Sequence, residues 1–120
     1  MPHLILEYSS NLSSDAAMNQ LLGKLHDTLG CIESFESDRI KSRALRFDAY
    51  RIGADDRRGF VHATVLFSPG RPEALRRELV KKLLTIIISE MRSPPGSFSA
   101  SVEVRQFEPG MYATERDEYE

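Results

Sequence analysis

Cysteine and long apolar stretches are scarce in this sequence, and each scarcity narrows what the chain can be. Cys31 is the only cysteine among 120 residues, so an intramolecular disulfide is impossible and a reducing compartment is the simplest interpretation. No apolar run reaches the roughly 18 residues that a membrane span needs, and the opening residues lack the basic and apolar segments of a secretory signal. We therefore expect a cytoplasmic protein that makes no contact with a membrane.

Strong net charge and motifs for binding metal or phosphate are also missing. The formal net charge is −2, and the aromatic residues are not interleaved with a basic patch, so we expect no nucleic-acid partner. The histidines, at positions 3, 26 and 62, show no metal-ligand spacing, so no metal is expected. His62 is interpreted as a hydrogen-bonded sheet residue rather than a catalyst.

The rest of the composition is that of one ordinary globular domain. Hydrophobic residues make up 41% and charged residues 28% of the chain, and a chain of this length can bury a core without disulfides. We expect a single domain over residues 1–120, with an acidic tail from about residue 109 that is either an arm or disordered.

Four segments are predicted to be β-strands. His3–Tyr8 is a short apolar run that begins almost at the first residue, and Phe60–Phe67 is rich in Val, Phe and Thr. Ile40–Ile52 alternates imperfectly, with a polar end and an apolar middle, and Ser99–Phe107 gives the last strand.

Two further segments have helical periodicity. In the first, Ser13 or Ser14 suits the N-cap and Gly30 the stop; its apolar face holds Met18, Leu21, Leu22, Leu25 and Leu29. In the second, Pro72 suits the first turn and Ser93-Pro94-Pro95-Gly96 ends the helix; its apolar face holds Leu75, Leu79, Leu83, Ile86 and Ile87.

The order of elements is strand, helix, strand, repeated once, which gives two βαβ-like units of similar length. It predicts an α/β (α+β) two-layer sandwich: a four-stranded mixed sheet with two helices on one face. The other face of the sheet then has no cover and includes apolar residues. We therefore expect an oligomer that hides this face.

Pro2 is the residue whose position points to chemistry. Removal of the initiator Met, which is usual before a small residue, leaves a secondary amine at the start of the chain. A free α-amino group has a pKa near ~8, and burial or nearby cations lower it, which would give a general base at neutral pH. A retained Met1 would instead make this nitrogen an amide, and many chains begin Met-Pro without using it.

Three cationic residues are candidates for binding a carboxylate. Arg71 stands at the amino-terminal edge of the second helix, where free N–H groups and the helix dipole favour anions. Lys41 and Arg43 are two residues apart on one face of the second strand, and with Arg71 they could line a pocket for a dicarboxylate or tricarboxylate. The alternative for each is an ordinary solvated position.

The opening Pro2-His3-Leu4-Ile5-Leu6-Glu7-Tyr8-Ser9-Ser10-Asn11 resembles the start of the 5-carboxymethyl-2-hydroxymuconate isomerases, tautomerase-superfamily enzymes of homoprotocatechuate degradation. Three further stretches resemble the same family: Ile40-Lys41-Ser42-Arg43, Phe60-Val61-His62-Ala63-Thr64 and Gly70-Arg71. The similarity covers most of the chain from Pro2 to about Phe107.

The resemblance implies a homotrimer and an isomerase that converts 5-carboxymethyl-2-hydroxymuconate-like dienol carboxylates to the conjugated ketone. Pro2 matches the family's base, and Arg71 and Arg43 match its carboxylate-binding arginines. Lys41 departs from the family, which usually has arginine there; lysine keeps the charge but loses the planar fork. No cofactor is expected, because a base and charge-stabilising cations suffice.

Two other functions stay open. Lys41 would suit a paralogue that acts on phenylpyruvate-like enols or on another unsaturated acid. The same two-layer sandwich also serves as a non-catalytic oligomeric ligand-binding module, and fold alone does not decide between them.

Overall fold

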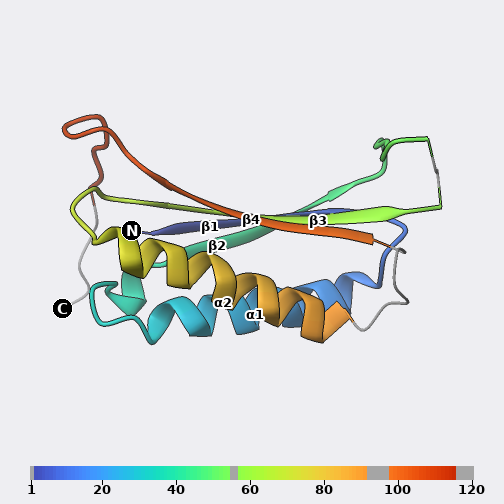
Figure 1. Cartoon of the computed structure of the whole chain (residues 1–120), viewed down its shortest axis with the longest axis horizontal. Helices are drawn as coiled ribbons and strands as arrows, with labels where there is room; N and C mark the ends of the chain where they lie inside the picture. The colour runs from blue at the N-terminus through green and yellow to red at the C-terminus, as the bar shows by residue number, and fades with distance from the viewer. Residues whose placement is uncertain (1, 55–56, 92–97, 116–120) are drawn as a thin grey trace.

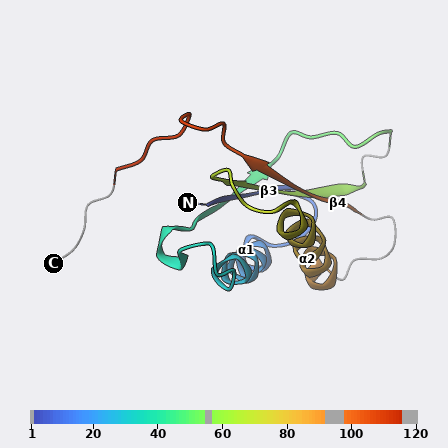
Figure 2. The same ribbon diagram turned by 60° about the vertical axis from the view of Figure 1, so that its left-hand side comes forward.

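The computed structural model describes residues 2–54, 57–91 and 98–115, in which a sheet and two helices form two layers (Figure 1). The strands are β1 (His3–Ser9), β2 (Lys41–Phe47), β3 (Gly59–Phe67) and β4 (Phe98–Gln106). The helices are α1 (Asp15–Gly30) and α2 (Glu73–Met91), with a short 3-10 turn at Ser37–Arg39. Figures 1 and 2 show both helices against the same face of the sheet.

The four strands follow the order β2-β1-β3-β4 across the sheet. β1 and β2 are parallel, β3 and β4 are parallel, and the central pair β1 and β3 is antiparallel. The sheet therefore joins two βαβ units through their first strands. This confirms the predicted four-stranded mixed sheet with two helices on one face.

Alternation along the strands decides which side chains enter the core. The even-numbered residues of β1 and the odd-numbered residues of β3 face the helices and are buried. They pack against the apolar faces of α1 and α2, whose buried residues are Met18, Leu21, Leu25, Leu29, Leu79, Leu83 and Ile87. The opposite face, which we term the open face, carries half-buried residues such as Ile5 and Leu66, and Leu45 is 50% exposed.

The ends of α1 refine the sequence prediction by one residue. Ser14, and not Ser13, is the N-cap, since its hydroxyl accepts a hydrogen bond from the Ala17 N–H at 3.1 Å. Gly30 is the last helical residue rather than the stop, because the Cys31 N–H still reaches the carbonyl of Asp27 at 3.2 Å. Cys31 itself is exposed.

The second strand is shorter than the predicted Ile40–Ile52. After Phe47 the chain leaves the sheet as an arm, visible in Figure 1 as the green segment between β2 and β3. Gly53 turns the arm at a φ of 56°, and the ring of Tyr50 meets that of Phe60 at a centroid distance of 6.4 Å. The arm therefore contacts β3 through the ring of Tyr50 without pairing with it as a strand.

The second helix begins as its sequence indicates, with Arg76 N–H donating to the carbonyl of Pro72 at 3.2 Å. The predicted helix end at Ser93-Pro94-Pro95-Gly96 lies outside the described residues. Within residues 2–54, 57–91 and 98–115, neither helix combines the length and apolar character that crossing a bilayer requires.

Candidate active site

Pro2 is held firmly at the start of the central strand, with its side chain fully buried. Its carbonyl accepts a hydrogen bond from the Lys41 N–H at 3.0 Å, which ties it to β2. On the other side His3 pairs with Leu66, and the next step of this antiparallel register places Pro2 opposite Phe67. The hydrogen bond to β2 therefore fixes the position of Pro2 at the start of β1.

Arg71 reaches the same end of the sheet from the loop before α2. Figures 1 and 2 show the start of the chain beside this loop. The guanidinium carbon of Arg71 lies 4.4 Å from the ring centroid of Phe35 and 5.4 Å from that of Phe67. Because the register of β1 and β3 places Phe67 opposite Pro2, Arg71 contacts a ring at the same end of the sheet as Pro2, on the helix-covered side.

Hydrogen bonds hold the Arg71 side chain in place but leave it donors to spare. Nε donates to the Ser34 hydroxyl at 3.2 Å, Nη2 to the Ser34 carbonyl at 2.8 Å and Nη1 to the Ser68 carbonyl at 2.9 Å. No acceptor in the described part of the chain takes the second N–H on Nη1 or Nη2, and each can donate to a carboxylate. Burial lowers the pKa of Arg71, yet a guanidinium stays protonated at neutral pH.

Lys41 and Arg43 lie on the open face, across the sheet from Arg71. Ser42 between them faces α1, where its hydroxyl lies 2.5 Å from Nδ1 of His26. Lys41 and Arg43 are both exposed. Within one chain, Lys41 and Arg43 thus lie on one face of the sheet and Arg71 on the other, so the three cations are not gathered on one face.

His3 also lies at this end of the sheet, as the first residue of β1. Nη1 of Arg43 lies 3.2 Å from its Nδ1, and the hydroxyl of Tyr112 lies 2.9 Å from its Nε2. Burial, followed by the charges of Arg43 and Lys41, lowers the pKa of His3. Because arginine can only donate, Nδ1 must accept, so the neutral ring carries its proton on Nε2.

The C-terminal segment brings Tyr112 to His3, a residue 109 positions earlier in the chain. The Phe107 N–H donates to the carbonyl of Phe67 at 2.9 Å, which extends β4 past its last residue. A turn with Gly110 at a φ of 80° then reverses the chain, and the ring of Tyr112 stacks on that of Phe107 at 4.4 Å. No sequence periodicity predicts this contact. The described part of the acidic tail is an arm.

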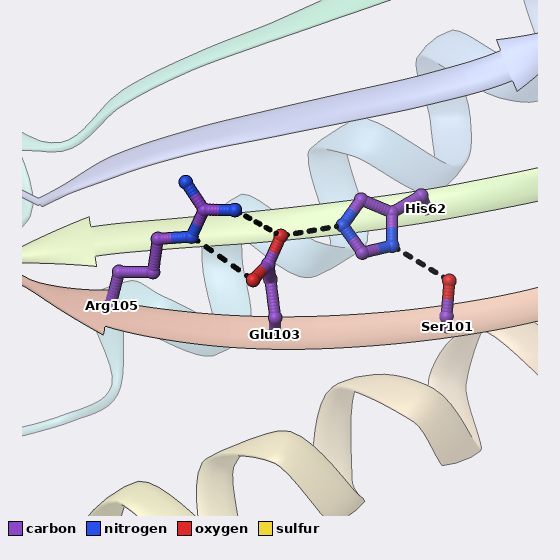
Figure 3. Close-up of polar contacts among 4 residues, drawn as sticks. All are labelled: His62, Ser101, Glu103 and Arg105. Carbon is purple, nitrogen blue, oxygen red and sulfur yellow. Dashed lines mark hydrogen bonds and ion pairs between the residues drawn. The ribbon is translucent and has the colours of Figure 1, made fainter.

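A second polar network crosses β3 and β4 on the open face (Figure 3). Nδ1 of His62 lies 2.7 Å from the Ser101 hydroxyl, and Nε2 lies 3.0 Å from a Glu103 carboxylate oxygen. Arg105 donates to the same carboxylate from Nε at 3.0 Å and Nη2 at 2.9 Å. Hydrogen bonds from Arg105 and then His62 lower the pKa of Glu103. His62 is thus a hydrogen-bonded sheet residue.

A cavity in the described chain lies away from Pro2. Its volume is about 750 Å³; it is formed by the arm at the far end of β2 and is lined by Asp48, Ala49, Tyr50, Arg51, Ile52, Gly53, Ala54 and Arg58. Pro2 lies beside the beginning of β2, not its end. Among the described residues, no three His, Cys, Asp or Glu side chains gather as metal ligands would.

Comparison with known proteins gives a family and a fold. The sequence matches the model of the 5-carboxymethyl-2-hydroxymuconate isomerase family over residues 2–116. A 5-carboxymethyl-2-hydroxymuconate isomerase structure from Deinococcus radiodurans R1 matches with a TM-score of 0.87 and 25% identity, covering 97% of this chain and 90% of that one. No curated protein sequence matches.

Two more distant structures share the fold. A 5-carboxymethyl-2-hydroxymuconate delta-isomerase has a TM-score of 0.75 and 19% identity, covering 98% of this chain and 89% of that one. A fused 4-OT described as a symmetric trimer has a TM-score of 0.74 and 14% identity, with coverages of 93% and 90%.

Proposed function

Since the chain belongs to the 5-carboxymethyl-2-hydroxymuconate isomerase family and is an isomerase, we propose that it converts a 5-carboxymethyl-2-hydroxymuconate-like dienol to the conjugated ketone with the Pro2 amine as base. The observation that carries this proposal is the position of Pro2, buried at the start of β1 and held by β2. Once Met1 is removed, a secondary amine stands at this fixed point.

The proposed reaction is a proton transfer that balances without a redox partner. The Pro2 nitrogen takes the proton of the 2-hydroxyl, and the O–H electron pair becomes part of the new carbonyl bond. The double bonds shift, and the same proton returns from nitrogen to a carbon of the dienol. The amine is neutral again at the end of the cycle, so a base and charge-stabilising cations suffice.

The cations at this end of the sheet suit such a substrate. Burial and the nearby charge of Arg71 would hold the pKa of the Pro2 amine below its ordinary value of about 8, so that it is neutral when substrate binds. The spare donors of Arg71 would bind one carboxylate and stabilise the developing enolate. Lys41 and Arg43 would bind a further carboxylate from the open-face side of the same end.

Lys41 favours a second candidate within the same chemistry. An ammonium cannot make the planar two-bond contact of a guanidinium, so carboxylate geometry at this position differs from that of an arginine. A phenylpyruvate-like enol or another unsaturated acid is the alternative substrate. Comparing kcat/KM across dienols with one, two and three carboxylates separates the two possibilities.

We also propose that the chain acts as a homotrimer in the cytoplasm, in the degradation of homoprotocatechuate. The open face supports a trimer, because it leaves half-buried apolar side chains without cover in a single chain. Two structures of similar fold are described as a symmetric and an asymmetric trimer of fused 4-OT. Sedimentation equilibrium of the tag-free protein measures the assembly.

The experiment that tests Pro2 is the intact mass of the tag-free protein before and after exposure to 3-bromopyruvate. The expected result is loss of one Met and an adduct that peptide mapping places on Pro2, separate from any adduct on the exposed thiol of Cys31. Replacing Pro2 with Ala leaves a primary amine and should lower kcat at least about 100-fold, the usual contribution of a general base. A retained Met1, or unchanged turnover in the Pro2→Ala variant, would exclude Pro2 as the base.

A further inference from the structure

The hydrogen bonds around His3 have a fixed direction. The guanidinium of Arg43 can only donate, so it donates to Nδ1 of His3. The His3 proton therefore sits on Nε2 and is donated to the Tyr112 oxygen, 2.9 Å away. This uses Tyr112 as an acceptor and leaves its own O–H proton for another partner.

Nothing in the described part of the chain takes that proton. Tyr112 is half-buried, with its ring fixed by the stack on Phe107 and by edge contact with His3 at 5.8 Å. Its hydroxyl makes no further hydrogen bond within residues 2–54, 57–91 and 98–115. A phenol oxygen that accepts one hydrogen bond is polarised toward donating another. The geometry thus presents an oriented donor without an acceptor.

The surroundings of this donor are cationic. Lys41 pairs with His3 across the sheet, and its ammonium has no ion-pair partner among the described residues. Arg43 uses one N–H on His3 and keeps the others. The ring of His3 is therefore surrounded by three hydrogen-bond donors: an ammonium, a guanidinium and a hydroxyl. An anionic oxygen can accept hydrogen bonds from all three.

We propose that the Tyr112 hydroxyl donates a hydrogen bond to a substrate carboxylate held by Lys41 and Arg43, and thereby favours substrates that carry more than one carboxylate. The inference rests on the proposed function, because it adds a specificity-determining residue to the same site. Arg71 binds the carboxylate on the helix-covered side of Pro2, and Tyr112 with the two open-face cations binds the second one.

The test compares two ligands that need no turnover and differ by one carboxylate. trans,trans-Muconate and sorbate share the same all-trans six-carbon diene skeleton, and calorimetry gives the Kd of each. In the Tyr112→Phe variant the ring stack survives and only the hydroxyl is lost. A hydrogen bond to a charged group is worth enough to predict about a tenfold weaker Kd for muconate, with the Kd of sorbate unchanged.

The Tyr50→Phe variant is the matched control, since it removes a hydroxyl from the arm at the far end of β2 and should leave both Kd values as in the wild type. An unchanged muconate Kd in Tyr112→Phe overturns the proposal, as does an equal loss for both ligands. Absence of muconate binding by the wild type, or a change of sedimentation in Tyr112→Phe, also overturns it.

These readouts are independent of the role of Pro2. A wild type that isomerises substrate while Tyr112→Phe binds muconate normally refutes only the Tyr112 subsite. A wild type without isomerase activity whose muconate affinity depends on Tyr112 refutes only the proposed reaction.

Discussion

The guanidinium of Arg71 lies over the ring of Phe35, 4.4 Å from its centroid. The same side chain binds the backbone at Ser34 and Ser68, so it joins the loop after α1 to the loop before α2. A residue predicted to bind substrate is therefore also a structural bridge. Its substitution should affect stability and catalysis together.

We expect Arg71→Lys to lower the free energy of unfolding by about 1–2 kcal/mol, because lysine loses the flat stack and the forked hydrogen bonds. KM for a dienol carboxylate should rise as well. Arg77→Lys is the matched control, since Arg77 is 73% exposed and its ion-pair partner among the described residues is Glu73 alone. Its effect should stay within about 0.5 kcal/mol. Urea denaturation measures both, and equal stability of the two variants would refute the bridge.

The charge of Arg43 is the second cause of the low pKa of His3, after burial. In Arg43→Gln the amide can still donate to Nδ1, but the charge is gone. The pKa of His3 should therefore rise toward 6.5 without reaching it, because burial persists. NMR titration of the His3 ring measures this shift, and an unchanged pKa would contradict the assigned contact.

The low pKa of His3 also sets a pH dependence of stability. The folded chain keeps the ring neutral, so its contribution is complete above the unfolded value of 6.5 and is lost as the pH falls through the folded pKa. Because Arg43→Gln should raise the folded pKa of His3, the pH range over which this stability is lost should become narrower at its lower end. Unfolding free energies measured at several pH values below 6.5 test whether stability falls with pH in this range.

Glu103 should control stability at lower pH. Its pKa is held down first by the hydrogen bond from Arg105 and then by that from His62. The stabilisation is complete above the unfolded value of 4.5 and is lost as the pH falls through the folded pKa. Glu103→Gln should flatten the stability profile there, whereas substitution of the exposed Glu33 by Gln should not. Identical profiles for the wild type and Glu103→Gln would refute the role of the network.

Two glycines provide a test of packing, because substitution by Ala should destabilise the protein at one position and stabilise it at the other. A methyl group on Gly59 would collide with the Leu12 side chain and lie 2.8 Å from the Ser9 hydroxyl, which accepts from the Phe60 N–H. We expect Gly59→Ala to cost about 1–3 kcal/mol. Gly23 lies in α1 with open space around it, so Gly23→Ala should stabilise the protein by about 0.5–1 kcal/mol. Thermal denaturation of both variants measures the pair.

The fold was readable from the sequence because its signals are local. The apolar spacing of Met18 to Leu29 specifies a helix, and the run before Ser68, rich in Val, Phe and Thr, specifies a strand. The repeated order of elements restricts the topology. The second strand was overextended because alternation continues past Phe47 into the arm. There, the ring of Tyr50 contacts that of Phe60, and residues 48–54 do not pair as a strand.

The candidate site was only partly readable. Sequence spacing correctly puts Lys41 and Arg43 on one face, but it gives no indication that Arg71 lies on the other side of the sheet. The contact between His3 and Tyr112 spans nearly the whole chain and depends on one turn at Gly110. The network of His62, Ser101 and Glu103 depends on the register of two parallel strands, which the sequence does not specify.

The pseudo-symmetry of the two βαβ units has a consequence for stoichiometry. Because β1 and β3 run in opposite directions, the first residues of the two units lie at opposite ends of the sheet. Pro2 precedes β1 and Arg58 precedes β3, yet only the former can become a chain terminus. If Pro2 is the amino terminus, as we propose, each chain offers one strand-initial amine instead of two, and complete alkylation should place one label per chain on Pro2, apart from any label on the exposed thiol of Cys31.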